Sequence, residues 1–175
     1  MVPWASSQLA VPAFWGGSFA VDSLNGVPLD QSFIGRTYPP ETSYEVSREK
    51  IREFADAIGD TNPVYRDPEA ARAAGYPDVV APPTFLTIIN LASINSIVTD
   101  PELGLDYSRM VHGDQGFSYT RPIHAGDVLR LTTYIDHIMA RAGNDFISLR
   151  ADITDAAGER LCTTRAQLVV RGEDA

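Results

Sequence analysis

Three polar residues in the first half of the chain could do acid–base chemistry together. Asp60 follows Gly59, Asn62 precedes a proline, and Tyr65 comes five residues after the aspartate. A carboxylate and a hydroxyl at this spacing could hold a water molecule and exchange a proton with a bound substrate. Tyrosine has an ordinary pKa of about 10, so its hydroxyl donates a hydrogen bond at neutral pH but is a poor general base.

The same residues also have a structural interpretation. Asp and Asn beside a helix-ending glycine and a proline commonly organise a turn through their own side chains. A tyrosine there is commonly a packed aromatic with a satisfied hydroxyl. On the local pattern alone, the structural interpretation of Asp60 is the stronger one.

The three histidines do not have the spacing of a metal site. We therefore expect neither zinc nor another cofactor. His112 lies in a strand-like segment and is expected to pin that strand by a hydrogen bond. Gln115, three residues later, would face the opposite side of a regular strand unless a bulge near Gly113 intervenes. His124 is expected to be exposed beside a turn, and His137 to lie in the core or at an interface.

Two helices are expected to position the Asp60 loop. Ser47 is a good N-cap for the first, and Gly59 would end it. A second, short helix over residues 69–74 is expected after Asp67-Pro68. The apolar stripe of the first helix consists of Ile51, Phe54, Ala55 and Ile58.

Residues 84–98 form the most apolar helical segment of the chain. Its apolar side chains lie nearly all round the helix, which predicts a buried central helix. Asn90 and Asn95 are the polar exceptions, and each must form hydrogen bonds or face an interface.

After Tyr107 the apolar period changes from that of a helix to that of a strand. Strands are predicted over residues 110–120, 129–136, 147–153 and 161–170, with turn sequences typical of hairpins between the last three. This order predicts an α+β fold in which an antiparallel sheet wraps around one apolar helix, the hot-dog arrangement.

Composition limits the class of protein. With 175 residues, 44 % hydrophobic and 21 % charged, the chain is expected to form one globular domain. The net charge of −9 disfavours nucleic acid and anionic membranes as partners. Cys162 is the single cysteine, which excludes an internal disulfide and fits the cytoplasm. We find no apolar run long enough for a membrane span.

The first residues differ from the rest. The segment contains no Lys, Arg or His before Arg36, and prolines and glycines interrupt it, so it does not match a secretory signal. We expect a flexible tail over residues 1–32 and a folded domain over residues 33–172; a downstream start site is an alternative interpretation. Both tryptophans, Trp4 and Trp15, would then lie outside the domain.

Two segments resemble the MaoC-like family of R-specific enoyl hydratases and dehydratases. Residues 54–85 read FADAIGDTNPVYRDPEAARAAGYPDVVAPPTF. They match the family loop Gly-Asp-x-Asn-Pro-x-His at Asp60 and Asn62, and Tyr65 takes the place of the histidine. The second segment contains His112-Gly113-Asp114-Gln115, followed by Arg121-Pro122 and Ala125-Gly126-Asp127. It resembles the half of two-domain eukaryotic hydratases that holds the acyl chain.

Together with Tyr38-Pro39 and residues 47–53, the combination resembles the actinobacterial group that includes the substrate-binding subunits of mycobacterial (3R)-hydroxyacyl-ACP dehydratases. The resemblance covers roughly residues 33–171. It implies that an Asp and a His hold water above the double bond of a trans-2-enoyl thioester, while a backbone N–H at the start of the central helix stabilises the charge on the thioester oxygen.

The resemblance assigns the candidate site residues. Asp60, Asn62 and Tyr65 are the catalytic candidates. Prolines have no N–H, so within Ala81-Pro82-Pro83 only Ala81, or Thr84 beyond it, could stabilise the oxyanion. The substrate-binding candidates are Ala81, Thr84, Phe85, Ile88, His112 and Gln115.

Three functions remain open. The chain could be a substrate-binding subunit of a dehydratase, paired with a catalytic MaoC-like subunit and offering an apolar groove in which each methylene contributes about 0.8 kcal/mol. It could be a self-sufficient homodimeric hydratase that uses Asp60. A hot-dog thioesterase is disfavoured, because residues 84–98 contain no carboxylate.

In each case the ligand is an acyl-ACP or acyl-CoA thioester. A dimer is expected because a single short sheet exposes an unpaired edge. The basic side chains Arg48, Lys50 and Arg52 could receive an acidic carrier despite the acidic surface. Acyl chain length and the choice between homodimer and heterodimer are not determined by these patterns.

Overall fold

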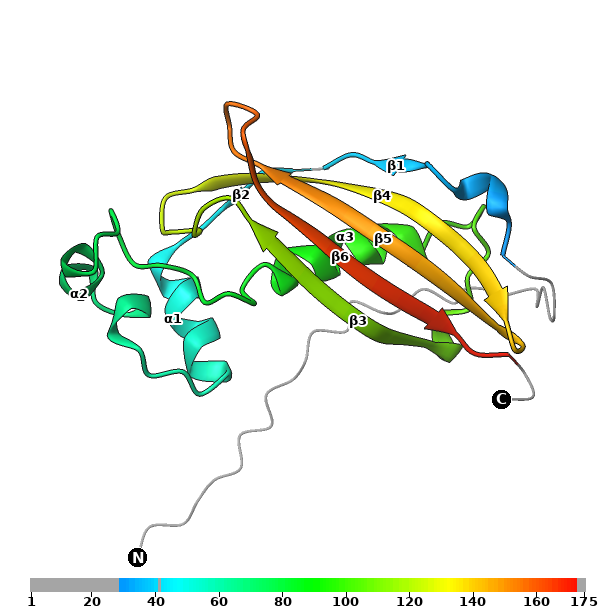
Figure 1. The fold of residues 1–175 in the computed structure, drawn as a ribbon, viewed down its shortest axis with the longest axis horizontal. Coiled ribbons are helices and arrows are strands. Elements are labelled where there is room, and N and C mark those ends of the chain that lie inside the picture. The colour runs from blue at the N-terminus through cyan, green and yellow to red at the C-terminus, as the bar shows by residue number, and fades with distance from the viewer. Residues whose placement is uncertain (1–28, 41, 173–175) are drawn as a thin grey trace, which may run out of the picture.

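A curved antiparallel sheet lies against one long helix (Figure 1). The computed structural model describes residues 29–40 and 42–172. The four long strands follow one another in sequence after the helix, and the sheet order is β1-β4-β5-β6-β3, with β2 also pairing with β4. The strands are β1 (Thr37–Tyr38), β2 (Tyr44–Glu45), β3 (Met110–Tyr119), β4 (Val128–Arg141), β5 (Asn144–Thr154) and β6 (Arg160–Val170). The predicted α+β hot-dog fold is confirmed.

The helices divide into a central one and two peripheral ones. The central helix is α3 (Thr87–Val98), and α1 (Arg48–Ala57) and α2 (Pro68–Ala73) lie beyond one end of the sheet (Figure 1). Short 3-10 turns, η1 (Gln31–Phe33), η2 (Pro63–Tyr65) and η3 (Tyr107–Arg109), complete the described elements.

The two peripheral helices start as the sequence predicts. Ser47 accepts a hydrogen bond from the Lys50 N–H (3.1 Å), and Asp67 accepts one from the Glu69 N–H (2.8 Å). Gly59, with φ of +72°, lies in the left-handed region just beyond α1. The loop that carries Asp60 therefore begins from a well-terminated helix.

The central helix begins at Thr87, three residues later than predicted. The preceding residues form turns, because the Phe85 N–H bonds to the Pro82 carbonyl and the Thr87 N–H bonds to the Thr84 carbonyl. Pro82 and Pro83 contribute no N–H to a helical ladder. This irregular entry leaves backbone groups of Thr84 outside the helix.

Only one side of α3 is covered by the sheet. Ile94, Ile97 and Val98 are buried on that side, whereas Leu91 is 51 % exposed and Ala92 is also exposed. In a single chain the predicted buried helix is therefore covered on one side only, because one sheet can cover only one face. An apolar strip of α3 is left exposed.

Two polar contacts join α3 to the sheet in the middle of the core. The Thr164 hydroxyl donates to Asn90 Oδ1 (3.2 Å), and Ser93 Oγ lies 2.5 Å from Thr133 Oγ1. These two contacts lie between two apolar clusters of the core. One cluster packs around the second half of α3, and the other packs around the residues at its start. Asn90 thus finds a buried partner for its Oδ1, whereas its Nδ2 is buried without an acceptor among the described residues, and Asn95 is exposed.

The domain begins earlier than the predicted residue 33. Leu29 packs against the apolar cluster at the end of α3, and its N–H donates to Asp145 Oδ2 (3.3 Å). Phe33 is buried in the same cluster. The predicted tail otherwise falls on residues 1–28, which lie outside the described residues together with Trp4 and Trp15.

Candidate functional site

The Asp60 loop is organised by its own side chains. Asp60 Oδ1 accepts a hydrogen bond from the Asn62 N–H (2.9 Å), and Asn62 Oδ1 accepts one from the Val64 N–H (3.2 Å). Both contacts are Asx-type turns, as the structural interpretation predicts. Asp60 Oδ2 accepts no hydrogen bond from the described residues, so one carboxylate oxygen remains open to water or a ligand.

Arg66 holds this loop against α1. Its Nη2 donates to the Asp60 carbonyl (2.5 Å), and its Nη1 pairs with the Asp56 carboxylate on the last turn of α1. Its Nε is buried and finds no acceptor within the described part of the chain. Sequence reasoning missed Arg66, because only the folded loop brings it back to Asp60.

Tyr65 takes the place of the expected histidine and is partly buried. Its ring packs against the apolar cluster that contains Phe85. Burial raises the pKa of the Tyr65 hydroxyl, and the nearby Asp60 carboxylate and Tyr76 raise it further. The hydroxyl therefore stays protonated at neutral pH and can donate but not act as a base.

The start of α3 offers an exposed backbone donor that has no acceptor among the described residues. The Ala81 N–H is already bonded to the Ile123 carbonyl (2.8 Å), which corrects the expectation that Ala81 could stabilise an oxyanion. Thr84 is exposed, and its N–H has no acceptor among the described residues. The hydroxyl of Tyr119 holds the Pro83 carbonyl (2.7 Å), so the peptide that carries this N–H is fixed.

One apolar cluster contains the side chains that follow this donor in the chain. Phe85 is fully buried and packs edge-on against Phe54, with ring centroids 5.6 Å apart. Phe85 was predicted to bind substrate, but as a core residue it can only support the side chains that a ligand would contact. Ile88, Phe117 and Tyr119 are only partly buried and pack on the same cluster. The loop reaches this region because the Val80 N–H bonds to the Val64 carbonyl (3.0 Å).

A β-bulge decides where His112 and Gln115 point. The register between β3 and β6 shifts between His112 and Asp114, so that His112 pairs with Leu168 and Gln115 with Ala166. Leu168 and Ala166 are buried on the inner face. Both candidates therefore lie on the face of the sheet that carries α3, which a regular strand would not allow.

His112 is nevertheless far from the loop of its own chain. The loop lies toward the Tyr119 end of β3, and seven residues separate Tyr119 from His112 in this strand, which corresponds to roughly 20 Å. His112 Nε2 instead lies 3.0 Å from the Asp114 carbonyl, and Gln115 Nε2 donates to the Arg165 carbonyl (2.9 Å).

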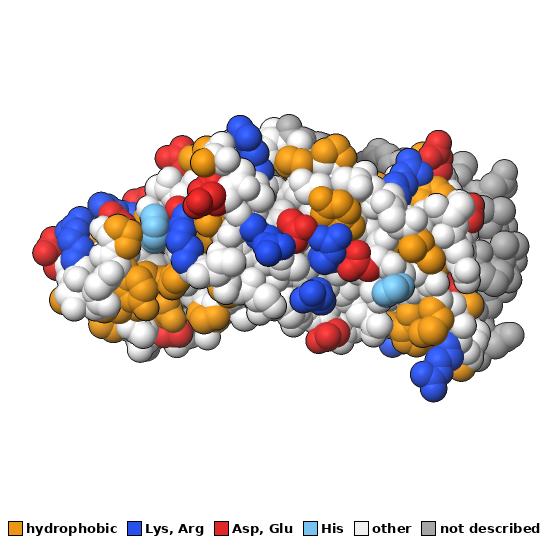
Figure 2. Space-filling model, turned by 45° about the horizontal axis from the view of Figure 1, so that its top comes forward, with side chains coloured by type: hydrophobic (Ala, Val, Ile, Leu, Met, Phe, Trp, Pro, Cys, Tyr) orange, Lys and Arg blue, Asp and Glu red, His pale blue; other side chains and the backbone are white. Residues whose placement is uncertain are grey.

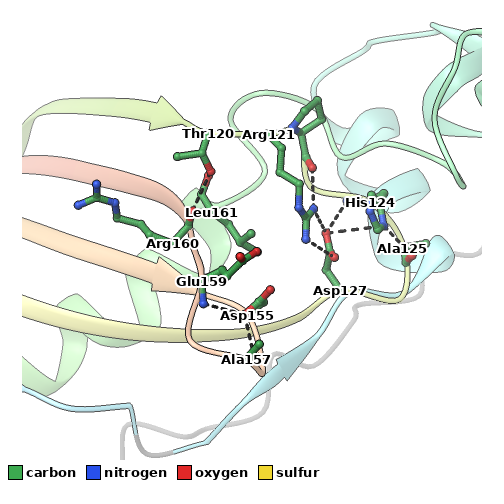
Figure 3. Close-up of polar contacts among 11 residues, drawn as sticks. Thr120, Arg121, His124, Ala125, Asp127, Asp155, Ala157, Glu159, Arg160 and Leu161 are labelled. Atoms are coloured by element: carbon green, nitrogen blue, oxygen red, sulfur yellow. Dashed lines mark hydrogen bonds and ion pairs between the residues drawn. The ribbon is translucent and has the colours of Figure 1, made fainter.

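The second motif contains a structural ion pair (Figure 3). Asp127 is 8 % exposed, and its carboxylate accepts two hydrogen bonds from Arg121 (2.8 Å each) and one from the His124 N–H (3.0 Å). Burial by itself would raise the pKa of Asp127, but these hydrogen bonds and the nearby positive charge bring it below its usual value. The pair fixes the turn that leads into β4.

His124 is less exposed than expected, and His137 does not lie in the core. His124 is partly buried in the Asp127 turn, with Nδ1 3.2 Å from the Ala125 carbonyl. His137 is exposed, because a register shift between Ile135 and His137 turns it outward. Within residues 29–40 and 42–172, no group of three His, Cys, Asp or Glu residues could hold a metal ion.

The three basic residues of α1 do not form a free basic patch. Arg48 is bound by Asp78 (2.6 Å) and Lys50 by Glu53 (2.9 Å). In the view of Figure 2, positive and negative side chains are intermixed. None of the described helices is long and apolar enough to cross a bilayer.

The family model for the FAS1-like dehydratase domain region matches residues 32–164. The chain belongs to this dehydratase family. Actinobacterial relatives are also close: a UPF0336 protein of Saccharopolyspora erythraea is 62 % identical over 146 residues, covering 83 % of this chain and 94 % of the relative. A UPF0336 protein of Streptomyces avermitilis is 58 % identical and covers 83 % and 97 %.

Solved dehydratase structures share the fold. A MaoC-like dehydratase is 34 % identical with a TM-score of 0.75; the match covers 82 % of this chain but only 43 % of that protein. The HadBC (3R-hydroxyacyl-ACP dehydratase) complex of Mycobacterium tuberculosis contains a chain that is 29 % identical with a TM-score of 0.74, covering 82 % and 99 %. The resemblance to MaoC-like dehydratases is confirmed at the level of family and fold.

Proposed function

We infer that this member of the dehydratase family is a subunit of a (3R)-hydroxyacyl thioester dehydratase, or enoyl hydratase, and that it binds substrate while a catalytic MaoC-like subunit does the chemistry. Its ligand is an acyl-ACP or acyl-CoA thioester, and its place of action is the cytoplasm. The similarity to a chain of the HadBC complex supports a paired assembly.

The observation that carries this proposal is the state of Tyr65. The loop around it is intact, with Asp60 and Asn62 in their turn and the Thr84 N–H free. The residue that should take the proton is instead a phenol whose pKa is raised by burial and by Asp60. Such a site can orient a thioester but lacks the imidazole that would share the proton transfer with the Asp60 carboxylate.

The groove for the acyl chain would lie beside α3. Ile88, Phe117 and Tyr119 are partly buried against the cluster that contains Phe85 and Leu86, and Leu91 is half exposed one helical turn after Thr87. Covering these side chains with an acyl chain or a second subunit removes apolar surface from water. The proposed dimer follows from the same uncovered strip together with the free edge of β3.

Purified alone, the protein should hydrate crotonyl-CoA and longer enoyl-CoA thioesters slowly or not at all. Tyr65→His restores an imidazole beside Asp60 and should raise turnover well above that of the unmodified protein. Tyr65→Phe is the matched control and should give no gain. Efficient hydration by the unmodified protein, abolished by Asp60→Asn, would overturn the proposal.

One observation favours a self-sufficient homodimeric hydratase as the second candidate. Asp60 Oδ2 is open and Tyr65 lies within electrostatic reach of the carboxylate, so the two could hold a water between them. A thioesterase has less support, since Thr87–Val98 reads TIINLASINSIV and contains no carboxylate.

A further inference from the structure

The turns before α3 contain an interrupted series of hydrogen bonds. Four backbone N–H groups bond to the carbonyl three residues earlier, those of Phe85, Thr87, Ile88 and Ile89. The same pattern would join the Leu86 N–H to the Pro83 carbonyl, but no such bond is present among the described residues. The Pro83 carbonyl instead accepts a hydrogen bond from the Tyr119 hydroxyl of β3 (2.7 Å). A side chain of the sheet therefore takes the place of the missing backbone donor.

Tyr119 is held firmly in the sheet. Its ring stacks on Phe117, with centroids 6.2 Å apart and planes inclined by 18°, and both rings pack on the apolar cluster that contains Phe85. Its backbone pairs with Cys162 of β6. Burial raises the pKa of the Tyr119 hydroxyl, and the nearby Cys162 raises it further. The hydroxyl therefore stays protonated at neutral pH and keeps donating to the Pro83 carbonyl.

This hydrogen bond acts directly on the donor of the candidate site. The Pro83 carbonyl and the Thr84 N–H belong to the same peptide unit. A hydrogen bond to the oxygen of a peptide polarises the unit and makes its N–H a stronger donor. The Thr84 N–H has no acceptor among the described residues, so the added strength is available to a ligand.

We propose that Tyr119 is a positioning residue for the thioester carbonyl, because its hydroxyl holds and polarises the peptide whose Thr84 N–H bonds to the thioester oxygen. The inference rests on the proposed function and names the residue that prepares its oxyanion donor. The hydroxyl also keeps the Pro83 carbonyl out of the helical ladder. Without it, the Leu86 N–H would take that carbonyl, continue the series of bonds and draw the Thr84 peptide into the turn.

Infrared spectroscopy of a bound ligand tests the polarisation. When trans-2-dodecenoyl-CoA, isotopically labelled at the thioester carbon, binds the wild-type protein, its carbonyl stretching frequency should fall, since a hydrogen bond weakens the C=O bond. Tyr119→Phe removes the hydroxyl but keeps the ring and its stacking on Phe117, and it should lose most of this shift. Tyr134→Phe is the matched control, because it removes a hydroxyl on the outer face, where Arg150 lies 4.2 Å from the ring centroid, and it should keep the shift. A full shift in Tyr119→Phe overturns the inference.

Binding constants separate positioning from packing. Affinity for trans-2-dodecenoyl-CoA should fall about fivefold in Tyr119→Phe, as expected when one hydrogen bond is weakened. Affinity for the thioether analogue, in which a methylene group replaces the carbonyl, should stay within about twofold of wild type. Equal losses for both ligands would mean that Tyr119 only packs, and no loss for either would mean that its hydroxyl does not act on the ligand. Both results overturn the inference while leaving the proposed function in place.

NMR of the ligand-free protein gives a readout that does not depend on binding. A hydrogen bond accepted by a carbonyl deshields the amide nitrogen of the next residue, so the Thr84 nitrogen resonance should move upfield in Tyr119→Phe and stay in place in Tyr134→Phe. An unmoved Thr84 resonance overturns the inference. If the wild-type protein binds no acyl thioester at all, the proposed function fails, and the Thr84 resonance still decides whether Tyr119 acts on this peptide.

Discussion

Removing the Arg121 guanidinium should destabilise the domain, because the buried Asp127 carboxylate would lose its positively charged partner. Asp127 is 8 % exposed, and Arg121 supplies two of the three hydrogen bonds that its carboxylate accepts. Breaking a fully buried pair costs about 3–5 kcal/mol. The Arg121 side chain is 37 % exposed, so water reaches the site, and we expect about 2–3 kcal/mol for Arg121→Ala.

The pH dependence gives this prediction a sign. The pKa of Asp127 is lowered in the folded protein, so the stability from its ionised form is present above the unfolded value of about 4 and is lost as pH falls through the folded pKa. Without Arg121, burial dominates and the pKa of Asp127 rises. The stability gap between wild type and Arg121→Ala should therefore be largest at neutral pH and narrow in acid.

Urea unfolding followed by circular dichroism at several pH values measures the gap. For a chain of this size, 2–3 kcal/mol corresponds to a fall in Tm of roughly 5–10 °C. Arg160→Ala removes an exposed arginine from the neighbouring strand (Figure 3) and should change stability by less than about 0.5 kcal/mol. An Arg121→Ala variant as stable as Arg160→Ala, or a gap that does not narrow in acid, would refute the reasoning.

Three further outcomes are expected. Phe85→Ala leaves a cavity at a fully buried site between α1 and the sheet and should lower the free energy of unfolding by about 3–5 kcal/mol in urea. Leu91→Ala is the control and should lower it by less than about 0.5 kcal/mol in the monomer, because Leu91 is exposed there. A small loss of stability in Phe85→Ala would contradict its place in the core. Leu91→Lys puts a charge on the uncovered face of α3 and should lower the dimer fraction in light scattering without unfolding the chain; an unchanged dimer would mean that this face is free in solution. The Cys162 thiol is fully buried and its pKa is raised by burial to about 11, so a thiol reagent at pH 8 should react with it only after denaturant is added; rapid labelling of the native protein would contradict this.

The regular elements were predictable because their signals are local. A cap such as Ser47, a terminating Gly59 and the alternation of β4 to β6 act within a few residues, and the structure follows them closely. The start of α3 was misplaced because a helical apolar pattern continues through Thr84 to Leu86, while the prolines before them withhold the N–H groups of a helix.

The candidate site was only partly predictable, because its chemistry depends on which backbone groups are already occupied. Ala81 and Thr84 were equal candidates as oxyanion donors, and only the bond to Ile123 separates them. Arg66 escaped notice because its contacts with Asp60 and Asp56 form only when the loop folds back on α1.

By itself, the amino-acid sequence determined the α+β class, the central helix, the sheet and the loop with Tyr65 in the place of the histidine, since periodicity and residue type are properties of the chain alone. Only the tertiary structure decided the face to which His112 and Gln115 belong, the side of α3 that stays uncovered and the donor that remains free. Each of these depends on hydrogen bonds and packing between residues far apart in the chain. The features responsible are the bulge at Gly113, the single face of α3 that the sheet covers, and the bond between the Ala81 N–H and the Ile123 carbonyl.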